Sequence, residues 1–348
     1  MLQQVLKAYG LNSVSVKVSA YGSGLINSTW LVMAEDKKYI LQKINQQVFK
    51  QPEAIEENIN TIASYLQTNH PEYLFTAPVK TTEGTAMVKM EGDGYYRLFP
   101  FVKDANSIDV VETAAQAFEA SSQFGRFTKM LSGLNVETLK TTIPSFHDLS
   151  LRYQQLLLSL ENGNKQRIED EATLIKEVKS FSFIVEEYEQ IKLNPAFKQR
   201  VTHHDTKISN VLFDSQAKGL CVIDLDTVMS GYFISDVGDM MRTYLSPVSE
   251  EETDFEKIEL RIPFYKAVVE GYYQEMKEEL TETEKKYFFY AGLFMIYMQA
   301  IRFLTDHFND DSYYGAKYKG HNLIRAKNQM NLLQKMMDKQ TILQMDFA

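Results

Sequence analysis

The stretch "THHDTKISNVLFD", from Thr202 to Asp214, concentrates polar side chains just before a hydrophobic run. "NVLFD" has the β-branched and aromatic character of a strand, "SQAKG" is typical of a turn, and "LCVIDLD" is a second strand-like run. The segment therefore predicts a loop that leads into a β-hairpin. Such a hairpin returns Asp224 to a position beside Asn210.

Asp205 and Asn210 are five residues apart, in the pattern H-x-D-x-x-x-x-N. Kinase-type phosphotransferases use this pattern to hold a catalytic base and a metal ligand, although the spacing alone also suits a polar turn. Asp205 can accept the proton of an acceptor hydroxyl, and the amide oxygen of Asn210 can bind Mg²⁺. Asp224 is predicted as a second Mg²⁺ ligand, because a carboxylate at the end of an apolar strand is costly without a cation. Asp226 would face the same side of that strand, where it either binds metal or orients the substrate.

A hydrolytic metal site built from His203, His204, Asp205 and Asp224 is the competing interpretation. Adjacent residues in a strand point to opposite faces, so the two histidines do not easily share one metal ion. We therefore predict that His203 is a buried, hydrogen-bonded side chain that braces the loop.

The chain has 348 residues, of which 44% are hydrophobic and 24% are charged, an ordinary globular composition. Its net charge of −9 makes nucleic acid and anionic membrane unfavourable partners. The single cysteine, Cys221, excludes a disulfide framework and a thiolate zinc site. "MLQQVLKAYG" lacks the features of a signal peptide, so we expect a cytoplasmic location. "YFFYAGLFMIYMQAIRFL" is interrupted by Gln299 and Arg302, and we predict a buried helix rather than a membrane span.

Strand signals dominate the first part of the chain and helix signals dominate the rest. The predicted strands are "VSVKVSAYG", "STWLVMAE", "KKYILQKI", "LFTAPVKT", "GTAMVKME" and "GYYRLFPFV". "PEAIEENINTIASYL" predicts a helix that begins at Pro52. After "FPFVKDANS" the pattern becomes helical, and "QRIEDEATLIKEVKSFSFIVEEYEQIK" is one long helical stretch. We predict an α+β fold with a β-rich nucleotide-binding lobe over residues 1–102 and a mainly helical catalytic and substrate lobe over residues 103–348.

Gly22, Ser23 and Gly24 lie in "YGSGLINST", between two predicted strands. Glycine permits positive φ angles and close approach of the backbone to a phosphate, and kinase-type enzymes cover ATP with a glycine-rich hairpin. The stretch is neither a Rossmann fingerprint nor a Walker A loop. An ordinary hairpin turn is the alternative interpretation.

Lys43 ends "YILQK", on what we predict to be the third strand. Leu41 and Lys43 share a face by strand alternation, which suits a strand that covers adenine and neutralises phosphate. A solvated strand lysine is the alternative, and no helix carboxylate stands out as a partner. The strand "YYRLFPFV" ends at Pro100, where the backbone of Phe101 and Val102 is predicted to meet an adenine edge.

The order of these motifs resembles the aminoglycoside phosphotransferase and choline kinase family over roughly residues 15–245. The coupled stretches "THHDTKISNVLF" and "VIDLDTVMSG" carry most of the resemblance. It implies a protein-kinase-like bilobal fold, ATP and Mg²⁺ as cofactors, Asp205 as the base, Asn210 and Asp224 as metal ligands and Lys43 as the phosphate cation. It also implies that Asp236 braces the catalytic loop.

Within the family, the similarity extends to N-acetylhexosamine 1-kinases through "LQKIN" at 41–45, "RLFPFV" at 97–102 and "RFLTDHFNDDSYY" at 302–314. This resemblance implies phosphorylation of the anomeric hydroxyl of GlcNAc or GalNAc. It points to Arg302 and Tyr313 as sugar contacts. An i,i+4 pair of Arg302 with Asp306 on a helix is the structural alternative.

Two other functions remain open on the sequence. One is a kinase of the same fold that acts on choline, homoserine or an aminoglycoside. The other is a nucleotide-binding protein without transferase activity, against which the intact Asp205, Asn210 and Asp224 argue. The oligomeric state does not follow from the sequence.

Overall fold

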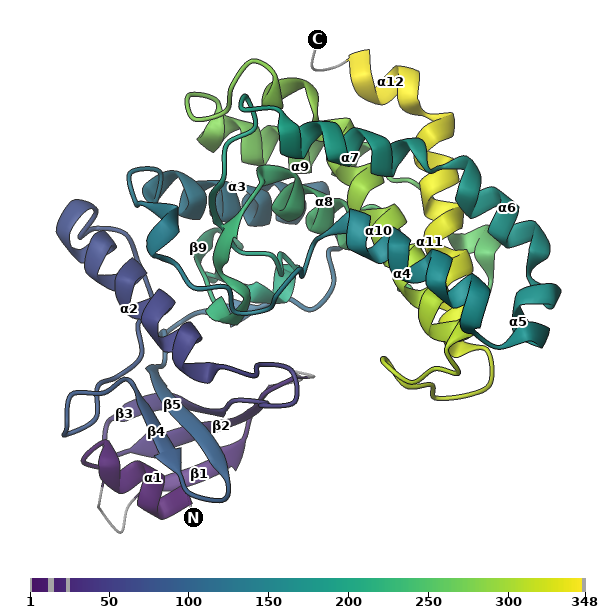
Figure 1. The fold of residues 1–348 in the computed structure, drawn as a ribbon. Helices are drawn as coiled ribbons and strands as arrows, with labels where there is room; N and C mark the ends of the chain where they lie inside the picture. Colours follow the sequence, from purple (N-terminus) through teal and green to yellow (C-terminus); the bar gives the residue numbers. More distant parts are fainter. Residues whose placement is uncertain (1, 12–15, 23–25, 346–348) are drawn as a thin grey trace.

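The computed structural model describes residues 2–11, 16–22 and 26–345, and it has two lobes (Figure 1). The first lobe is an antiparallel sheet with two helices, and the second is mainly helical (Figure 1). The predicted α+β, protein-kinase-like fold is confirmed.

The five-stranded sheet of the first lobe has the order β1-β2-β3-β5-β4, and all its neighbours are antiparallel. Its strands are β1 (Lys17–Ala20), β2 (Ser28–Ala34), β3 (Lys37–Lys43), β4 (Met87–Met90) and β5 (Gly94–Pro100). The strand predicted at "LFTAPVKT" is wrong, because this segment has no strand structure. Val79 donates to the carbonyl of Leu98 at 2.7 Å, but Pro78 has no amide hydrogen with which to extend the ladder.

The two faces of this sheet have different neighbours. Leu41 and Tyr96 lie on the outer face, in a cluster with Leu6 of helix α1 (Leu2–Ala8). Gln42 and Arg97 form the next cross-strand pair, so their side chains lie on the opposite face, toward the helical lobe. The packing of α1 therefore decides which strand residues face the helical lobe.

Helix α2 (Pro52–Asn69) begins at the predicted proline and buries its apolar face. It joins the lobes, because the Asn58 side chain donates to the carbonyls of Lys140 at 2.8 Å and Val228 at 2.9 Å. Figure 1 shows α2 between the sheet and the helical lobe. The apolar face of α2 thus packs against the helical lobe, and the side-chain amide of Asn58 forms hydrogen bonds within this contact.

The helical lobe contains α3 (Ala114–Met130), α4 (Leu149–Asn162), α5 (Lys165–Asp170), α6 (Ala172–Ser180), α7 (Phe183–Leu193), α8 (Phe233–Tyr244), α9 (Ile262–Met276), α10 (Phe288–Phe308), α11 (His321–Asp338) and α12 (Gln340–Met345). The long helical stretch predicted before residue 193 is divided into α5, α6 and α7. Its breaks fall at Glu171 and at Phe181–Ser182. They turn the chain so that α5 and α7 both contact α10.

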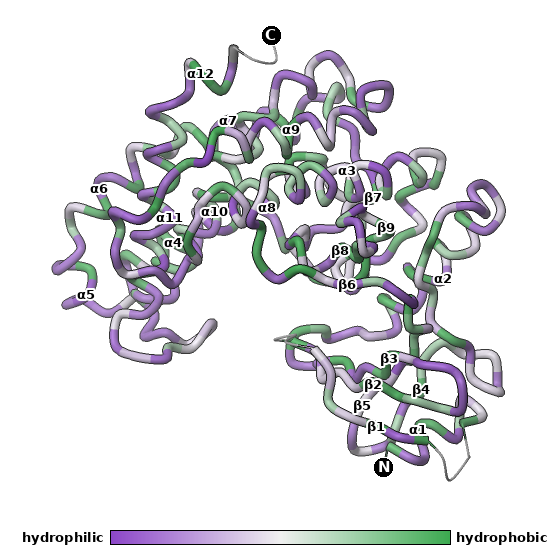
Figure 2. The backbone as a smooth tube through the Cα atoms, turned by 180° about the vertical axis from the view of Figure 1, so that it is seen from behind, coloured by the Kyte–Doolittle hydropathy of each residue, from purple (hydrophilic) through white to green (hydrophobic). Residues whose placement is uncertain are grey.

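Helix α10 is the core of the second lobe, and the predicted buried helix is confirmed. Among the described residues it is the one helix long and apolar enough to cross a membrane, yet 89% of its apolar window is buried in the protein. Figure 2 shows hydrophobic residues in the sheet and the inner helices, and mostly hydrophilic residues on the outer helices α5 and α6.

Short strands cross the second lobe near the cleft. They are β6 (Asn106–Ser107), β7 (Arg200–Thr202), β8 (Val211–Phe213), β9 (Gly219–Val222) and β10 (Met229–Gly231). The predicted hairpin is confirmed as the antiparallel pair β8–β9. Strand β9 ends before Asp224, and Asp226 lies in the 3₁₀ turn Leu225–Thr227. The expectation that Asp224 and Asp226 share one strand face is therefore wrong.

Candidate active site

The polar loop after β7 is held by the first turns of α8. The Asp236 carboxylate accepts the backbone amides of His203 at 2.9 Å and His204 at 2.8 Å. Asp239 accepts the amide of Thr206 at 2.8 Å. Burial raises the pKa of Asp236 to about 7, although the two amide donors act in the opposite direction. Asp236 thus braces the loop as the resemblance implies.

The two histidines serve the loop rather than a metal ion. The His203 ring hydrogen-bonds to the carbonyl of Ile223 at 2.9 Å and packs edge-on against Phe124 and Phe127, with ring centroids 5.1 and 6.2 Å away. Burial lowers the pKa of His203 and brings that of His204 to about 4, so both rings are neutral near pH 7. His204 has a φ of 64°, in the left-handed region. The predicted bracing role of His203 is confirmed. Among the described residues, no group of three or more His, Cys, Asp and Glu side chains is placed to hold a metal ion.

Asp205 and Asn210 lie together, as their spacing predicts. The Asn210 amide donates to the Asp205 carbonyl at 2.9 Å and to its carboxylate at 3.1 Å. The Lys207 ammonium lies 3.3 Å from the same carboxylate. Lys207 was not predicted as a site residue, although it follows Asp205 by only two residues in the sequence. The Asp205 carboxylate is therefore held from two sides while remaining partly exposed.

Asp224 lies beside Asn210, because the amide of Ile223 donates to the Asn210 carbonyl at 2.8 Å. Asp224 has a φ of 61°, which turns the chain out of β9. Surrounding protein atoms and the carboxylates of Asp226 and Asp205 raise the pKa of Asp224 to about 7. Asp224 is exposed to solvent, so water or a bound cation can screen this repulsion. The carboxylates of Asp205 and Asp224 and the side-chain amide of Asn210 offer oxygen ligands of the kind that a hard cation such as Mg²⁺ prefers.

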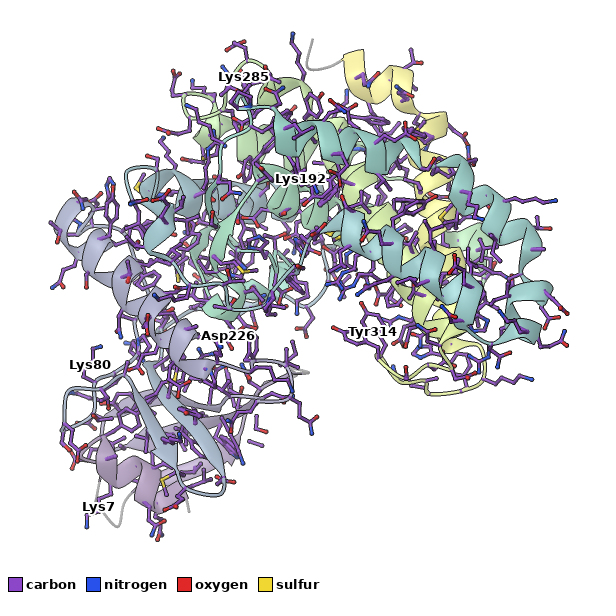
Figure 3. All side chains as sticks on the ribbon, in the orientation of Figure 1. Lys7, Lys80, Lys192, Asp226, Lys285 and Tyr314 are labelled. Carbon is purple, nitrogen blue, oxygen red and sulfur yellow. The ribbon has the colours of Figure 1, made fainter. Side chains whose placement is uncertain are left out.

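Asp226 differs from its predicted role as a substrate contact. It is 1% exposed and forms an ion pair with Arg97 of β5, across the two lobes. Its second oxygen accepts the Asn27 side-chain amide at 2.8 Å. Figure 3 labels Asp226 where the lobes meet. Because its carboxylate is buried and paired with Arg97 and Asn27, Asp226 joins the lobes instead of facing an acceptor.

Lys43 also differs from its predicted position. Its ammonium pairs with Asp93 at 2.5 Å and lies 5.7 Å from the ring centroid of Tyr96. Lys43 pairs with Tyr96 across β3 and β5, so it lies on the α1 face of the sheet. Asp93, in the turn between β4 and β5, is the partner that the sequence did not reveal.

The glycine-rich hairpin is described in part. Gly22 has a φ of 79°, and a Cβ there would meet open space. The predicted nucleotide contacts Ser23 and Gly24 lie outside the described residues. At the base of the hairpin, Asn27 accepts the backbone amide of Asn45 at 3.0 Å. This bond fixes the hairpin to the end of β3.

The connector at the end of β5 follows an apolar cross-strand pair. Ile40 and Phe99 form a half-buried cross-strand pair on the same face as Arg97. The amide of Phe101 donates to the carbonyl of Lys38 at 3.1 Å, so it is not free for an adenine edge as predicted. The predicted adenine contact of Val102 stays a prediction.

A cavity of about 440 Å³ opens in the helical lobe between α4, α10 and the loop after α10. It is lined by Arg152, Gln155, Leu158, Ser159, Asn162, Arg302, Thr305, Asp306, Asn309, Ser312, Tyr313 and Tyr314. The two predicted sugar contacts, Arg302 and Tyr313, thus line one cavity. The alternative pair of Arg302 with Asp306 does not form, because Asp306 accepts the amides of Tyr313 at 2.7 Å and Tyr314 at 2.9 Å. Figure 3 labels Tyr314 on the side of the helical lobe toward the sheet lobe.

Aromatic rings connect this cavity to the catalytic loop. The His147 ring lies 5.2 Å from the His204 ring and stacks on Phe146 at 4.4 Å. The Arg302 guanidinium lies 5.9 Å from the Phe146 ring centroid. The cavity therefore begins close to the loop that carries Asp205.

Arginine side chains give the cavity a positive character. Neither Arg152 nor Arg302 forms an ion pair with a carboxylate among the described residues. Burial and the charge of Arg302 lower the pKa of Arg152. No sequence pattern pointed to Arg152, because α4 brings it to Arg302 only in the folded chain.

The antiparallel sheet lobe and a helical lobe that carries Asp205, Asn210 and Asp224 together have the arrangement of a small-molecule phosphotransferase. The chain belongs to the phosphotransferase enzyme family (APH), whose model matches residues 17–272.

Three solved structures share the fold over nearly the whole chain. A microcompartment-associated aminopropanol kinase has a TM-score of 0.64 at 16% identity, with 100% of this chain and 99% of that chain covered. An aminoglycoside phosphotransferase from Alicyclobacillus acidocaldarius has a TM-score of 0.65 at 10% identity, with 99% and 96% covered. An amicoumacin kinase has a TM-score of 0.61 at 14% identity, with 96% and 92% covered.

Proposed function

We propose that this phosphotransferase is an ATP- and Mg²⁺-dependent kinase of the anomeric hydroxyl of an N-acetylhexosamine, GlcNAc or GalNAc. The similar amicoumacin kinase was solved with AMP-PNP and Ca²⁺, which supports a nucleotide and a divalent cation as cofactors. Asn210 and Asp224 would hold Mg²⁺, whose charge offsets that of the phosphates when it is bound.

The chemistry falls to the residues of the catalytic loop. Asp205 orients the acceptor hydroxyl and accepts its proton as the phosphoryl group is transferred. Asn210 and Lys207 keep this carboxylate in place. Catalysis in this site rests mainly on positioning and electrostatics, because phosphoryl transfer needs little covalent help from the protein.

The proposed class of acceptor rests on one observation, the arginine-lined cavity. Arg152 and Arg302 face the cavity, whereas the lining carboxylate of Asp306 is engaged by backbone amides. Guanidinium groups donate hydrogen bonds and repel ammonium groups, so a neutral sugar with hydroxyl and acetamide oxygens fits better than an amine. This charge argues against choline and aminoglycosides as acceptors.

A panel of acceptors tests the proposal. GlcNAc, GalNAc, glucose, choline, aminopropanol, homoserine and kanamycin are each incubated with MgATP, and ³¹P NMR locates the phosphate in the product. Phosphate on C1 of a hexosamine is the expected outcome. Transfer to an amino alcohol or aminoglycoside alone would overturn the sugar assignment, and ATP-binding without any transfer would favour a non-catalytic nucleotide-binding protein.

Arg302→Met is expected to raise the KM for the sugar about tenfold or more, the loss expected for a hydrogen bond from a charged donor. The KM for ATP is expected to remain unchanged, because Arg302 lies in the acceptor cavity. Lys319→Met, an exposed cation of the neighbouring loop, is the matched control. Steady-state kinetics with each substrate varied in turn measures both constants, and an equal rise in both would contradict this placement.

Asp224→Asn is expected to raise the Mg²⁺ concentration needed for half-maximal activity by about tenfold or more, because a neutral amide replaces a charged ligand. The acceptor KM measured at saturating Mg²⁺ is expected to stay near that of the wild type. A magnesium titration of initial rates measures the change. An unaltered magnesium requirement would show that Asp224 does not bind the cation.

A further inference from the structure

Glu250, in the connection between α8 and α9 (residues 245–261), binds two arginines from different helices. Its Oε2 atom accepts a hydrogen bond from Arg242 of α8 at 2.9 Å, and its Oε1 atom pairs with Arg325 of α11. The side chains of Arg242, Glu250 and Arg325 are 16, 25 and 14% exposed, so water and salt screen these pairs less than pairs on the open surface. One carboxylate therefore joins two helices that are far apart in the chain.

The first arginine leads from Glu250 to the catalytic loop. The Nε and Nη2 atoms of Arg242 donate to the Oδ1 atom of Asp239 at 3.1 and 2.9 Å. The other oxygen of Asp239 accepts the backbone amide of Thr206 at 2.8 Å, and Thr206 follows Asp205 directly. Glu250 thus contacts the side chain that orients the carboxylate beneath the catalytic loop.

The second arginine leads from Glu250 to the wall of the arginine-lined cavity. The Arg325 guanidinium lies 5.4 Å from the ring centroid of Tyr314, which lines the cavity. It also donates to the Asn322 side chain at 3.3 Å, and Asn322 donates to Asp306 at 3.0 Å. Asp306 in turn accepts the backbone amide of Tyr314. Arg325 therefore supports both the ring and the backbone of this wall residue.

The neighbouring carboxylate, Glu251, has a different arrangement. Lys317 donates to both of its oxygens at 2.8 Å, and the His321 ring lies 3.5 Å away. The side chains of Lys317 and Glu251 are 68 and 42% exposed, so this pair is expected to contribute little. Both partners also belong to the chain after α10, and neither leads to the catalytic loop. Of the two carboxylates, Glu250 is thus the one that connects the two sites.

We propose that Glu250 is a positioning residue for phosphoryl transfer, which holds the wall of the acceptor cavity at a fixed place relative to the loop that carries Asp205. The proposal rests on the assignment of this cavity to the acceptor, made above. It applies to any acceptor that the cavity binds. Such a role has a large effect on rate, because a misplacement of reacting groups by about 1 Å can cost about 10²-fold.

Steady-state kinetics of Glu250→Gln with GlcNAc and ATP varied in turn tests the role in transfer. The amide keeps the size of the side chain but removes the charge that both arginines share. The KM for GlcNAc is expected to rise about tenfold and kcat to fall about tenfold, the loss expected for charge-assisted hydrogen bonds. The KM for ATP is expected to stay unchanged. Glu259→Gln, an exposed glutamate of the same connection, is the matched control.

A purely structural role of Glu250 predicts a different result. Loss of folded protein lowers kcat but leaves both KM values unchanged, because KM does not depend on the concentration of active enzyme. Glu250→Asp, which keeps the charge on a shorter side chain, is expected to recover part of the GlcNAc KM that Glu250→Gln loses. A lower kcat with an unchanged GlcNAc KM would overturn the proposal, and so would an equal rise in both KM values.

Hydrogen exchange tests the connection itself and needs no acceptor. In Glu250→Gln, the backbone amides of Thr206 and Tyr314 are both expected to exchange about tenfold faster, because each is held through one of the two arginines. The amides of β9 are expected to exchange at the wild-type rate. Faster exchange at Thr206 alone or at Tyr314 alone would overturn the connection. If the wild type transferred no phosphate to GlcNAc, the proposed function would fail, whereas the exchange rates would still decide whether Glu250 joins the two sites.

Discussion

Asp205→Ala is expected to lower kcat for phosphoryl transfer by about 10²-fold or more, the contribution typical of a general base. The variant loses the carboxylate that Asn210 and Lys207 hold in the cleft. ATP binding is expected to remain close to that of the wild type, because the substitution leaves the proposed Mg²⁺ ligands Asn210 and Asp224 in place. Rapid-quench or coupled kinetics measures kcat, and calorimetry measures ATP affinity.

Asp36→Ala is the matched control for this experiment, because Asp36 is an exposed aspartate in the turn between β2 and β3. It is expected to behave as the wild type. Turnover of Asp205→Ala at the wild-type rate would show that another group accepts the proton. Loss of ATP binding together with kcat would instead assign Asp205 to the nucleotide site.

Asp236→Ala is expected to destabilise the protein as well as slow it. The substitution leaves the buried amides of His203 and His204 without an acceptor. Each such group costs about 1–3 kcal/mol, so the free energy of unfolding is expected to fall by about 2–6 kcal/mol. Because the same amides position Asp205, kcat is expected to fall too. Denaturant unfolding and steady-state kinetics measure the two effects.

Asp236→Asn is the matched comparison, since an amide keeps one acceptor oxygen and turns an NH₂ group toward the other backbone amide. Its loss of stability is expected to lie between those of the wild type and Asp236→Ala. If Asp236→Ala unfolded at the same denaturant concentration as the wild type, the brace would have no energetic role in the loop.

Much of the catalytic loop could be predicted from the sequence because its contacts are local. Asp205 and Asn210 are joined within one short loop, and the hairpin β8–β9 brings Asp224 back through neighbouring strands. Spacing and strand pairing carry that information directly. The shape of the turn was not predicted, because the left-handed conformation of Asp224 and the 3₁₀ turn at Asp226 follow no simple residue pattern.

The position of Lys43 shows where the sequence was insufficient. Strand alternation correctly separated Lys43 from Gln42, but alternation does not say which face of the strand meets the cleft. Helix α1, which was not predicted, covers the face that carries Leu41 and Lys43. Arg97 therefore lies toward the helical lobe, although no local sequence pattern predicted this position.

By itself the sequence determined the kinase-type loop, the β8–β9 hairpin and the family resemblance, because all of these depend on short-range spacing and periodicity. The tertiary structure decided which face of the sheet meets the helical lobe, the burial of Asp226 between the lobes and the meeting of Arg152 with Arg302. These features depend on packing between segments far apart in the chain. The physical reason is that local pattern limits which faces a strand or helix has, whereas only burial against a partner selects among them.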